Sequence, residues 1–387
     1  MNGGIEKTPK LRFPEFSGEW ENYSLKSLAK IFDGTHQTPK YTKEGVPFVS
    51  VEDIGDPYAT QKFISEVAYK KDFRNTPQSG DILMTRITAG VIGATSIVKD
   101  DRPLGYYVSL ALIRPKDNVA TEFLASQIQS DGFKRELHKR IIHVAFPKKI
   151  NLGDIGHCVS VLPETYGEQQ KIAAFLGAVD TKIAQLADKK RLAEDYKKGC
   201  MQQLFSQKIR FKDDTGNDFP DWEEKRLGEL VNVTTGSSNR EDSEDVGEYA
   251  FFDRSNDQRR SSKFLYDCEA LIVAGEGKDF PPRYFKGRFD LHQRAYAITD
   301  FEKASAKFLF YWISWHRHHF LKFSVGSTMP SLRMAAFNKF PVALPHPDEQ
   351  QKIADFLSAI DAKISLVADE LRAAQTFKKG LLQQMFV

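Results

Sequence analysis

The chain has 387 residues, of which 41% are hydrophobic and 28% are charged, and both fractions are typical of globular proteins. This length predicts two to four domains, and the composition argues against a disordered chain. No stretch approaches the roughly 18 apolar residues of a membrane span, and Met1–Lys10 lacks the apolar segment of a signal peptide. Three widely spaced cysteines predict neither a disulfide framework nor a zinc site. We expect a soluble cytoplasmic protein with no membrane partner.

The charge is almost balanced, with 55 basic and 52 acidic residues and a formal net charge of +3. A nucleic-acid-binding protein more often has a strongly basic domain. The balance does not exclude such a protein, because a basic groove can be offset by acidic surface elsewhere. Any contact with nucleic acid is therefore expected from local clusters of residues.

The first part of the chain predicts a strand-rich mixed domain. Apolar runs and alternations between turn residues predict four strands, at 46–54, 80–87, 93–98 and 107–115. The amphipathic segment 121–141 predicts a helix with a break near Gly132.

A long helix follows, and its sequence occurs twice. Residues 168–205 and 349–386 are identical at about 22 of 38 aligned positions. Apolar residues alternate at spacings of four and three, as in the seam of a coiled coil. Two matched seams in one chain can pack antiparallel against each other; an amphipathic helix packed on its own domain is the alternative. The seam comprises Ile172, Leu176, Val179, Ile183 and Leu186, and in the second copy Ile353, Leu357, Ile360, Ile364 and Val367.

The second part of the chain predicts a domain similar to the first. Segments 249–252, 269–277 and 294–299 predict strands, and 307–323 predicts a helix. A weaker repeat opens both parts, since 20–34 aligns without gaps to 222–236. The fold class is therefore α+β: two mixed α/β domains separated by two long antiparallel coiled-coil helices, with a pseudo-two-fold internal repeat.

Motifs for catalysis are not found in the sequence. The string nearest to the [D/N]PP[Y/F] loop of adenine methyltransferases is DFPPRY at 279–284, where Phe280 separates the acid from the prolines. No GxxxxGK phosphate-binding loop occurs, and the GEG at 275–277 is too short to indicate a cofactor site. Three histidines at 316–319 lack the spacing of zinc ligands, so a polar helix face explains them better. We predict no catalytic residues, no metal and no cofactor.

Loops rich in hydrogen-bond donors remain as candidate binding sites. They combine the residue types that contact phosphates and base edges, and they occur at equivalent places in both halves. Each loop by itself could be ordinary surface. The candidates in the first half are Thr35, His36, Gln37, Lys40, Tyr41, Thr85, Arg86, Lys148 and Lys149. Those in the second half are Ser238, Asn239, Arg240, Arg254, Lys278, Arg283, His292, Gln293, Arg294 and Arg333.

These features together resemble a known family. The phrase EQQKIAxFL, followed by DxKI and KKGxxQQxF and present twice, closely resembles the specificity subunit of Type I restriction–modification systems. The segments 34–54 and 80–87 and the loops 151–156 and 326–333 resemble it too. The resemblance implies target-recognition domains at 1–166 and 207–347 and spacer helices at 167–206 and 348–387.

The resemblance also implies a function and partners. It implies recognition of a split double-stranded DNA sequence, one half-site per domain, by a chain that is not itself an enzyme. Partner methyltransferase subunits would methylate adenine, and partner restriction subunits would translocate and cleave DNA. Two alternatives come from other classes of protein: a bivalent scaffold that does not bind DNA, and a single-chain DNA-modifying enzyme.

Overall fold

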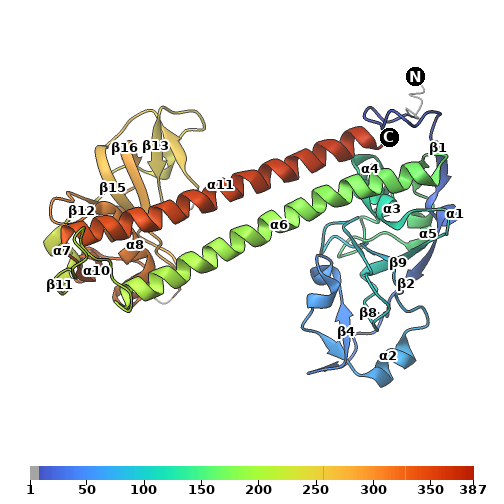
Figure 1. Cartoon of the computed structure of the whole chain (residues 1–387), viewed down its shortest axis with the longest axis horizontal. Coiled ribbons are helices and arrows are strands. Elements are labelled where there is room, and N and C mark those ends of the chain that lie inside the picture. The colour runs from blue at the N-terminus through green and yellow to red at the C-terminus, as the bar shows by residue number, and fades with distance from the viewer. Residues whose placement is uncertain (1–7, 256, 327) are drawn as a thin grey trace. The chain divides into compact units, whose positions relative to one another are not determined.

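The computed structural model describes residues 8–255, 257–326 and 328–387. Met1–Lys7 and two residues of the candidate loops, Asn256 and Ser327, lie outside this part. The chain divides into two units, which are described separately (Figure 1). Unit 1 contains the residues up to Ala187 together with Asp369–Val387, and unit 2 contains Asp188–Ala368. Each of the two long helices, α6 (Tyr166–Phe205) and α11 (Pro347–Met385), is therefore shared between the units.

Unit 1 contains two four-stranded sheets and five short helices. The first sheet has the order β2 (Ala29–Asp33), β9 (Leu110–Pro115), β6 (Ile82–Thr85), β7 (Thr95–Ile97) and is antiparallel throughout. The second has the order β3 (Tyr41–Thr42), β5 (Phe63–Ile64), β4 (Val46–Val49), β8 (Gly105–Tyr106). A separate pair joins β1 (Glu21–Ser24) to β10 (Val159–Leu162). The helices are α1 (Leu25–Leu28), α2 (Glu66–Asp72), α3 (Thr121–Ile128), α4 (Asp131–His138) and α5 (Leu152–Gly156).

Unit 2 is built around one six-stranded sheet. Its order is β12 (Asn232–Thr235), β17 (Ala295–Thr299), β15 (Tyr266–Ala274), β16 (Arg283–Leu291), β13 (Tyr249–Phe252), β14 (Arg259–Ser261). Another pair joins β11 (Glu223–Arg226) to β18 (Pro341–Leu344). The helices are α7 (Leu227–Leu230), α8 (Ala306–His316), α9 (His318–Phe323) and α10 (Met334–Asn338).

The two units repeat the same arrangement around their central strands. In unit 1, β2 pairs with β9 and β9 pairs with β6, while in unit 2 β12 pairs with β17 and β17 pairs with β15, all antiparallel. A short strand and a one-turn helix precede the first strand of each set. The fold class expected from the sequence is confirmed.

Most of the expected elements are present. The helix expected over 121–141 is broken near Gly132, since α3 ends at Ile128 and the Ser130 hydroxyl caps α4. The helix expected over 307–323 is likewise two helices, α8 and α9. Strand β16 is not among the strands expected from the sequence, which places Arg283 in a candidate binding loop. Charged residues and Gly287 interrupt its apolar pattern, so the period-two signal of a strand is weak there.

Seam residues of the long helices pack within each unit. In unit 1, Ile172 and Leu176 share a core cluster with Leu381 and Met385, so the start of α6 meets the end of α11. In unit 2 the end of α6 meets the start of α11, and that core includes Leu204, Ile353 and Leu357. The helices are thus antiparallel in both units. Of the ten seam residues expected from the sequence, Val179, Ile183 and Ile364 are half-buried and the other seven are buried.

Ion pairs follow the same repeat. Lys378 Nζ lies 2.6 Å from Asp180 Oδ1 in unit 1, and Lys197 Nζ lies 2.6 Å from Asp361 Oδ1 in unit 2. These residues exchange places when one copy of the repeated helix is aligned with the other. Each unit thus contains the same lysine–aspartate pair between its parts of the two long helices.

The EQQ sequence at the start of each long helix anchors that helix to its unit. In unit 1, Arg12 binds both carboxylate oxygens of buried Glu168 at 2.7 and 2.8 Å, and the indole of Trp20 donates to the same group at 3.3 Å. Gln169 accepts a hydrogen bond from the backbone N–H of Ala120 at 2.9 Å. Repetition of the motif is thus explained by its structural role.

The same anchor occurs in unit 2. Arg210 binds Glu349 at 3.1 and 2.7 Å, Trp222 donates to it at 3.0 Å, and Gln350 accepts from the N–H of Ser305 at 2.8 Å. Hydrogen bonds to the glutamate raise the pKa of both arginines, Arg12 and Arg210.

Candidate nucleic-acid interface

The first candidate loop of unit 1 begins at Gly34, where any side chain would collide with the neighbouring backbone. A Cβ at Gly34 would lie 2.5 Å from the carbonyl oxygen of Tyr106. This close approach lets the chain leave β2 along Tyr106–Tyr107, where the N–H of Thr35 donates to Tyr106 at 3.1 Å. Thr35 is half-buried at the base of the loop, while the other four candidates are exposed: His36, Gln37, Lys40 and Tyr41.

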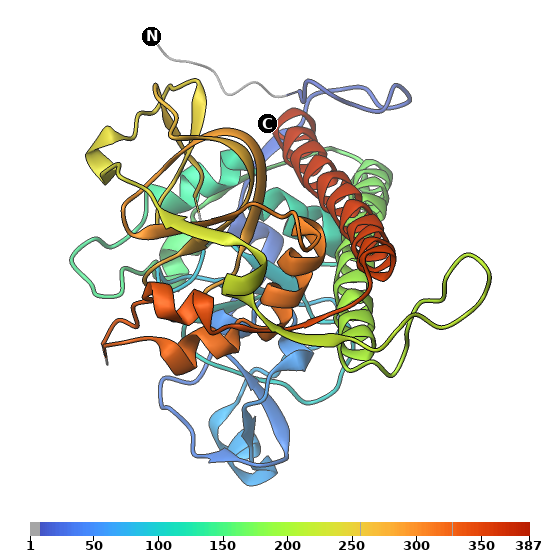
Figure 2. The same ribbon diagram turned by 90° about the vertical axis from the view of Figure 1, so that its left-hand side faces the viewer.

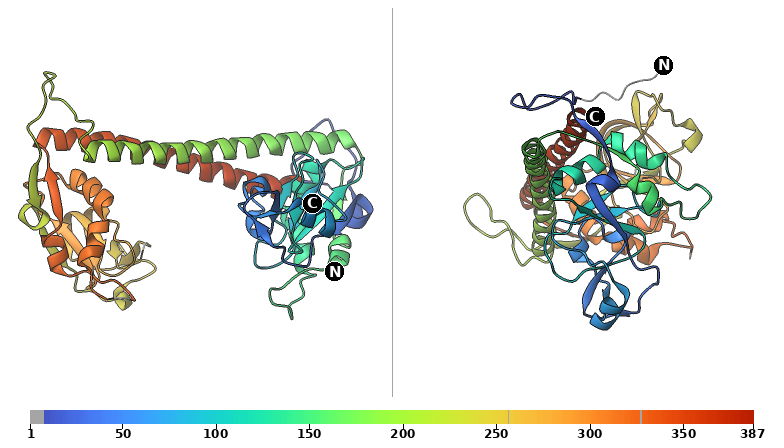
Figure 3. Two further views of the ribbon diagram at one scale, coloured as in Figure 1. Left: turned by 90° about the horizontal axis from the view of Figure 1, so that it is seen from below. Right: turned by 90° about the vertical axis from the view of Figure 1, so that its right-hand side faces the viewer.

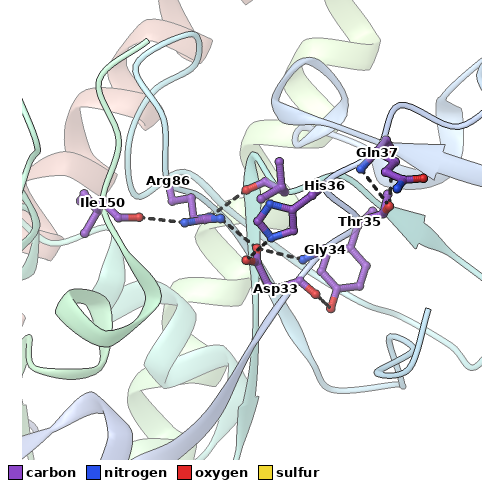
Figure 4. Close-up of polar contacts among 9 residues, drawn as sticks. Asp33, Gly34, Thr35, His36, Gln37, Arg86 and Ile150 are labelled. Atoms are coloured by element: carbon purple, nitrogen blue, oxygen red, sulfur yellow. Dashed lines mark hydrogen bonds and ion pairs between the residues drawn. The ribbon is translucent and has the colours of Figure 1, made fainter. Parts of the chain in front are cut away.

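Arg86 holds that loop from inside the unit (Figure 4). Its guanidinium donates to the carbonyl oxygens of Val108 at 2.8 Å and Ile150 at 3.0 Å, and to the Asp33 carboxylate at 2.8 Å. The other oxygen of Asp33 lies 2.8 Å from Nε2 of His36. Arg86 therefore links the end of β2, the start of the loop and the segment before α5.

The expectation that Thr85 and Arg86 contact DNA does not fit their burial. Both side chains are buried, with Thr85 fully inaccessible and Arg86 6% exposed. The Thr85 hydroxyl donates to the carbonyl of Val91, and each of the three guanidinium nitrogens of Arg86 already donates one hydrogen bond inside the unit. If Arg86 turned outwards to contact a base, its hydrogen bonds to one carboxylate and two carbonyl groups would break. This would cost more free energy than one base contact contributes. Arg86 positions the loop.

Two hollows flank the exposed part of this loop. One, of about 520 Å³, is lined by Thr35, His36 and Gln37 together with Lys71 and Arg74. The other, of about 270 Å³, is lined by residues including Tyr41, Phe48, Lys62 and Tyr107. Lys62, Lys71 and Arg74 were not singled out from the sequence, because nothing in their local pattern distinguishes them from ordinary surface cations.

Lys148 and Lys149 lie on the loop between α4 and α5, and both are exposed. The backbone of Lys149 forms bridges with Ile87 and Ile142, and the carbonyl of Lys148 accepts from the N–H of Thr88 at 2.9 Å. The structure thus places these lysines next to Arg86 and to the 270 Å³ hollow, which Ile87 also lines.

In unit 2, the loop after β12 begins in the same way. A Cβ at Gly236 would lie 1.8 Å from the carbonyl oxygen of Leu291. Ser238 then pairs with His292, as Thr35 pairs with Tyr107 in unit 1. The expectation that Ser238 contacts DNA does not fit its burial: it is 1% exposed and donates to Asp290 at 2.6 Å.

Several exposed candidates converge on a hollow of about 380 Å³ in unit 2. It is lined by Asn239, Arg240, Arg254, His292, Gln293 and Arg294, with Glu241 and Asp253. They come from three segments, the loop after β12, the loop after β13 and the turn between β16 and β17. Most of these residues were predicted as candidates from the sequence, and the structure shows that they line one surface.

Glu276 fixes the direction of two arginines at this surface. Arg254 and Arg294 lie 3.1 and 3.0 Å from its two carboxylate oxygens, and each remains more than half exposed. The Gln293 amide donates to Asn239 at 2.6 Å. An adjoining hollow of about 240 Å³ is lined by Glu276, Gln293, Arg294 and exposed Arg333. Glu276 neutralises part of the charge of Arg254 and Arg294 and orders both side chains. Their other guanidinium N–H groups remain able to donate.

His292 is held as a neutral side chain. Burial lowers its pKa, and its Nδ1 accepts a hydrogen bond from the N–H of Arg294 at 3.0 Å. With Nδ1 accepting, the neutral ring carries its proton on Nε2 and is a single donor.

The assignment of Arg283 to a binding loop is corrected by the structure. Arg283 lies in β16, donates to the carbonyls of Ser255 and Asp253 at 3.0 and 2.8 Å, and stacks over Phe252. Burial lowers its pKa. It supports the loop that carries Arg254. Lys278, by contrast, is exposed in the turn before β16.

No group of three or more His, Cys, Asp and Glu side chains within the described ranges is placed to hold a metal ion. Nor is any helix in the described part of the chain both long and apolar enough to cross a membrane.

Two similar α/β units, each with polar loops gathered beside its central strands, define a protein with an internally repeated fold. A model of the Type I restriction modification DNA specificity domain matches residues 17–194 and again residues 220–374. The chain belongs to this family.

Relatives and solved structures agree with this assignment. The putative type I restriction enzyme MjaX specificity subunit of Methanocaldococcus jannaschii is 23% identical over 411 residues, 97% of this chain and 95% of the relative. The Type I restriction enzyme EcoDI specificity subunit of Escherichia coli is 29% identical over 144 residues, 37% of this chain and only 32% of that relative.

The fold is shared with solved structures of low identity. The crystal structure of a Type I restriction–modification S subunit from M. genitalium has a TM-score of 0.65 at 15% identity, covering 98% of this chain and 99% of that chain. A chain from a structure of type I R-M complex assembly and conformational transition has a TM-score of 0.51 at 14% identity, covering 94% and 96%. At these identities the likeness concerns the fold.

Proposed function

We propose that this chain recognises a DNA target in two parts, with the loops of unit 1 contacting one half-site and those of unit 2 the other. The observation that carries the proposal is the equivalent placement of polar loops in two units of a chain that belongs to a DNA specificity family. In each unit a loop leaves the first central strand at an irreplaceable glycine, and a second loop lies beside it.

Base recognition is assigned to the exposed amides and cations. In unit 1 these are His36, Gln37 and Lys40, and in unit 2 Asn239, Arg240, Arg254, Gln293, Arg294 and Arg333. Arginine donates bidentately to guanine, and asparagine or glutamine pairs with adenine in the major groove. Exposed lysines such as Lys148, Lys149 and Lys278 suit phosphate contacts, which hold the protein without specifying sequence.

The chain itself performs no chemistry in this proposal. The methyltransferase subunits of the complex transfer the methyl group to adenine, and the restriction subunits translocate and cleave DNA. The chain selects the DNA on which they act and needs no cofactor of its own. Target-recognition boundaries of 1–166 and 207–347, with spacers at 167–206 and 348–387, are part of this proposal.

The test is to map methylated adenines in a host that carries this chain with its methyltransferase subunits. The expected result is one motif made of two specific blocks separated by a nonspecific gap. A single uninterrupted motif, or the absence of sequence preference, would refute the proposal.

The two alternatives are separated by simple measurements. A scaffold that does not bind DNA would show no salt-dependent binding to duplex DNA by itself, whereas phosphate contacts made by this chain would give an affinity that falls steeply with salt. A single-chain modifying enzyme would methylate DNA without partner subunits.

A further inference from the structure

Each unit carries a short loop whose tip exposes apolar side chains beside the candidate DNA-contacting residues. In unit 1 the loop spans 142–149, and it projects from the unit between α4 and α5 (Figures 2 and 3). Its base is closed by a hydrogen bond from the N–H of Ile142 to the carbonyl of Lys149 at 2.8 Å. The pairing of Lys149 with Ile87 fixes that base to the end of β6. The tip is therefore held out from a rigid support.

Val144 and Phe146 at this tip are fully exposed, at 97% and 103%. An isolated exposed apolar side chain is common on protein surfaces. Here two of them lie close together on a projecting loop whose base is held by backbone hydrogen bonds, so the loop exposes a small apolar tip. Phe146 is thus available to insert into a partner.

The charge around this tip identifies the partner. The stretch from Lys139 to Lys149 contains four lysines and arginines, of which Lys139 and Arg140 pair with Glu136 at 2.8 Å each. Lys148 and Lys149 directly follow the apolar tip and are exposed. An apolar side chain flanked by cations fits duplex DNA, where the cations meet phosphates and the apolar group enters between base pairs. The loop also adjoins the hollow lined by Tyr41 and Lys62.

Unit 2 has an equivalent loop of unrelated sequence. Val325 and Ser331 exchange two backbone hydrogen bonds at 2.9 and 2.8 Å, and the N–H of Gly277 donates to the carbonyl of Pro330 at 3.0 Å. Met329 near the tip is 51% exposed. Exposed Arg333 follows, and Val325–Met334 contains no acidic residue. A loop held at its base, an exposed apolar side chain and an exposed basic residue that follows it therefore occur in both units, although in unit 2 Glu276 also pairs with Ser331 of the loop.

We propose that Phe146 and Met329 act as wedges that insert between neighbouring base pairs, one in each half-site. This inference rests on the proposed function and adds to it a mode of recognition by DNA deformability. A wedge partially unstacks a base step and kinks the duplex by about 20–90°. Because flexible pyrimidine–purine steps open at lower cost, each wedge selects sequence at a position where no hydrogen bond is made.

The test uses the full chain assembled with its methyltransferase subunits, on target duplexes that carry 2-aminopurine at successive positions of each half-site. Methyltransferases extrude their target base, so fluorescence should rise at the target adenine with or without a wedge. For the unaltered complex it should also rise on binding at one further step per half-site, because unstacking relieves quenching. Phe146→Ala should remove the rise at this further step in the first half-site, keep it in the second, and weaken binding about tenfold, or about 1.4 kcal/mol. Phe146→Leu should retain most of both effects.

A matched control excludes a general effect of removing an exposed apolar group. Val67 in α2 of the same unit is 77% exposed, and Val67→Ala should change neither affinity nor fluorescence. Met329→Ala should give the reciprocal result in the second half-site. Since Phe146 is fully exposed, its removal takes nothing from the core.

Three outcomes would overturn the inference. Equal affinity and an equal fluorescence rise for Phe146→Ala would show that the side chain does not enter the stack. Loss of subunit assembly with this variant would show that the tip contacts a protein. An unaltered complex with sequence-specific binding but no unstacked step apart from the target adenine would refute the wedge alone, whereas a complex with no sequence-specific binding would refute the proposed function as well.

Discussion

Replacing Glu349 by glutamine tests the anchor between a long helix and its unit. Glu349 is fully buried, and its carboxylate receives two hydrogen bonds from Arg210 and one from Trp222. Glutamine keeps the shape of the side chain and one acceptor oxygen, but it removes the negative charge. The guanidinium of Arg210, which is 20% exposed, then loses its bidentate partner.

The cost follows from this burial. Breaking one side of a buried ion pair costs about 3–5 kcal/mol, because the remaining charge is left uncompensated. One kcal/mol lowers the midpoint of thermal unfolding by about 2–4 °C in a domain of roughly 150–250 residues. The transition of unit 2 should therefore fall by about 6–20 °C. Glu168→Gln should have a similar effect on unit 1, where Arg12 and Trp20 have the same roles.

Urea and thermal denaturation of the variants provide the measurement. Glu302→Gln is the control, since Glu302 is an exposed carboxylate in the same unit. The double variant Glu349→Gln, Arg210→Met should lose less than the sum of the single changes, because the stranded charge is removed too. A loss below about 1 kcal/mol for Glu349→Gln, or strict additivity in the double variant, would refute the anchor.

Three further predictions concern the loops and the core. Arg86→Lys should destabilise unit 1 by about 2–4 kcal/mol and weaken recognition of the first half-site, because a lysine cannot donate to Asp33, Val108 and Ile150 at once. Arg102→Ala, at an exposed arginine, is the control. Unchanged recognition of the first half-site by Arg86→Lys would contradict the positioning role. Arg294→Ala should cost about 1–3 kcal/mol in DNA affinity and relax one position of the second half-site, as measured by competition binding; equal losses on specific and random DNA would assign Arg294 to phosphate. Burial lowers the pKa of His316 to about 4, so below pH 6.5 the unfolded chain holds more protons than the folded one, and stability falls as the pH drops towards 4. Discounted for partial exposure, this loss should be about 1–2 kcal/mol and absent in His316→Gln; equal urea midpoints for both proteins across this range would contradict it.

The packing face of the two long helices could be predicted from the sequence because periodicity is a local signal. The spacing of four and three residues follows from helix geometry, so Ile172 and Ile353 could be placed on a packing face from their spacing alone. The duplicated EQQ was visible too, but its role was not. Its partners Arg12 and Arg210 lie 156 and 139 residues from the glutamates, and no local pattern joins them.

Candidate contact residues were harder to predict, for a physical reason. In the sequence, a buried arginine with internal hydrogen-bond partners cannot be distinguished from an exposed arginine that binds DNA when both lie in similar loops. Arg86 and Arg283 were therefore grouped with Arg254 and Arg294, and only burial and hydrogen bonds separate them. The acidic partner Glu276 was missed because it lies in a short GEG turn that showed no function by itself.

The central claim is that two units of one chain each recognise their own half of one DNA target. Its most direct test is to map methylated adenines in hosts carrying complexes with Gln37→Ala or with Arg294→Ala, alongside the unaltered chain. We predict that Gln37→Ala relaxes positions in one block only and that Arg294→Ala relaxes positions in the other block only. Relaxation of the same block by both variants, or of both blocks by either one, would contradict the division of recognition between the units.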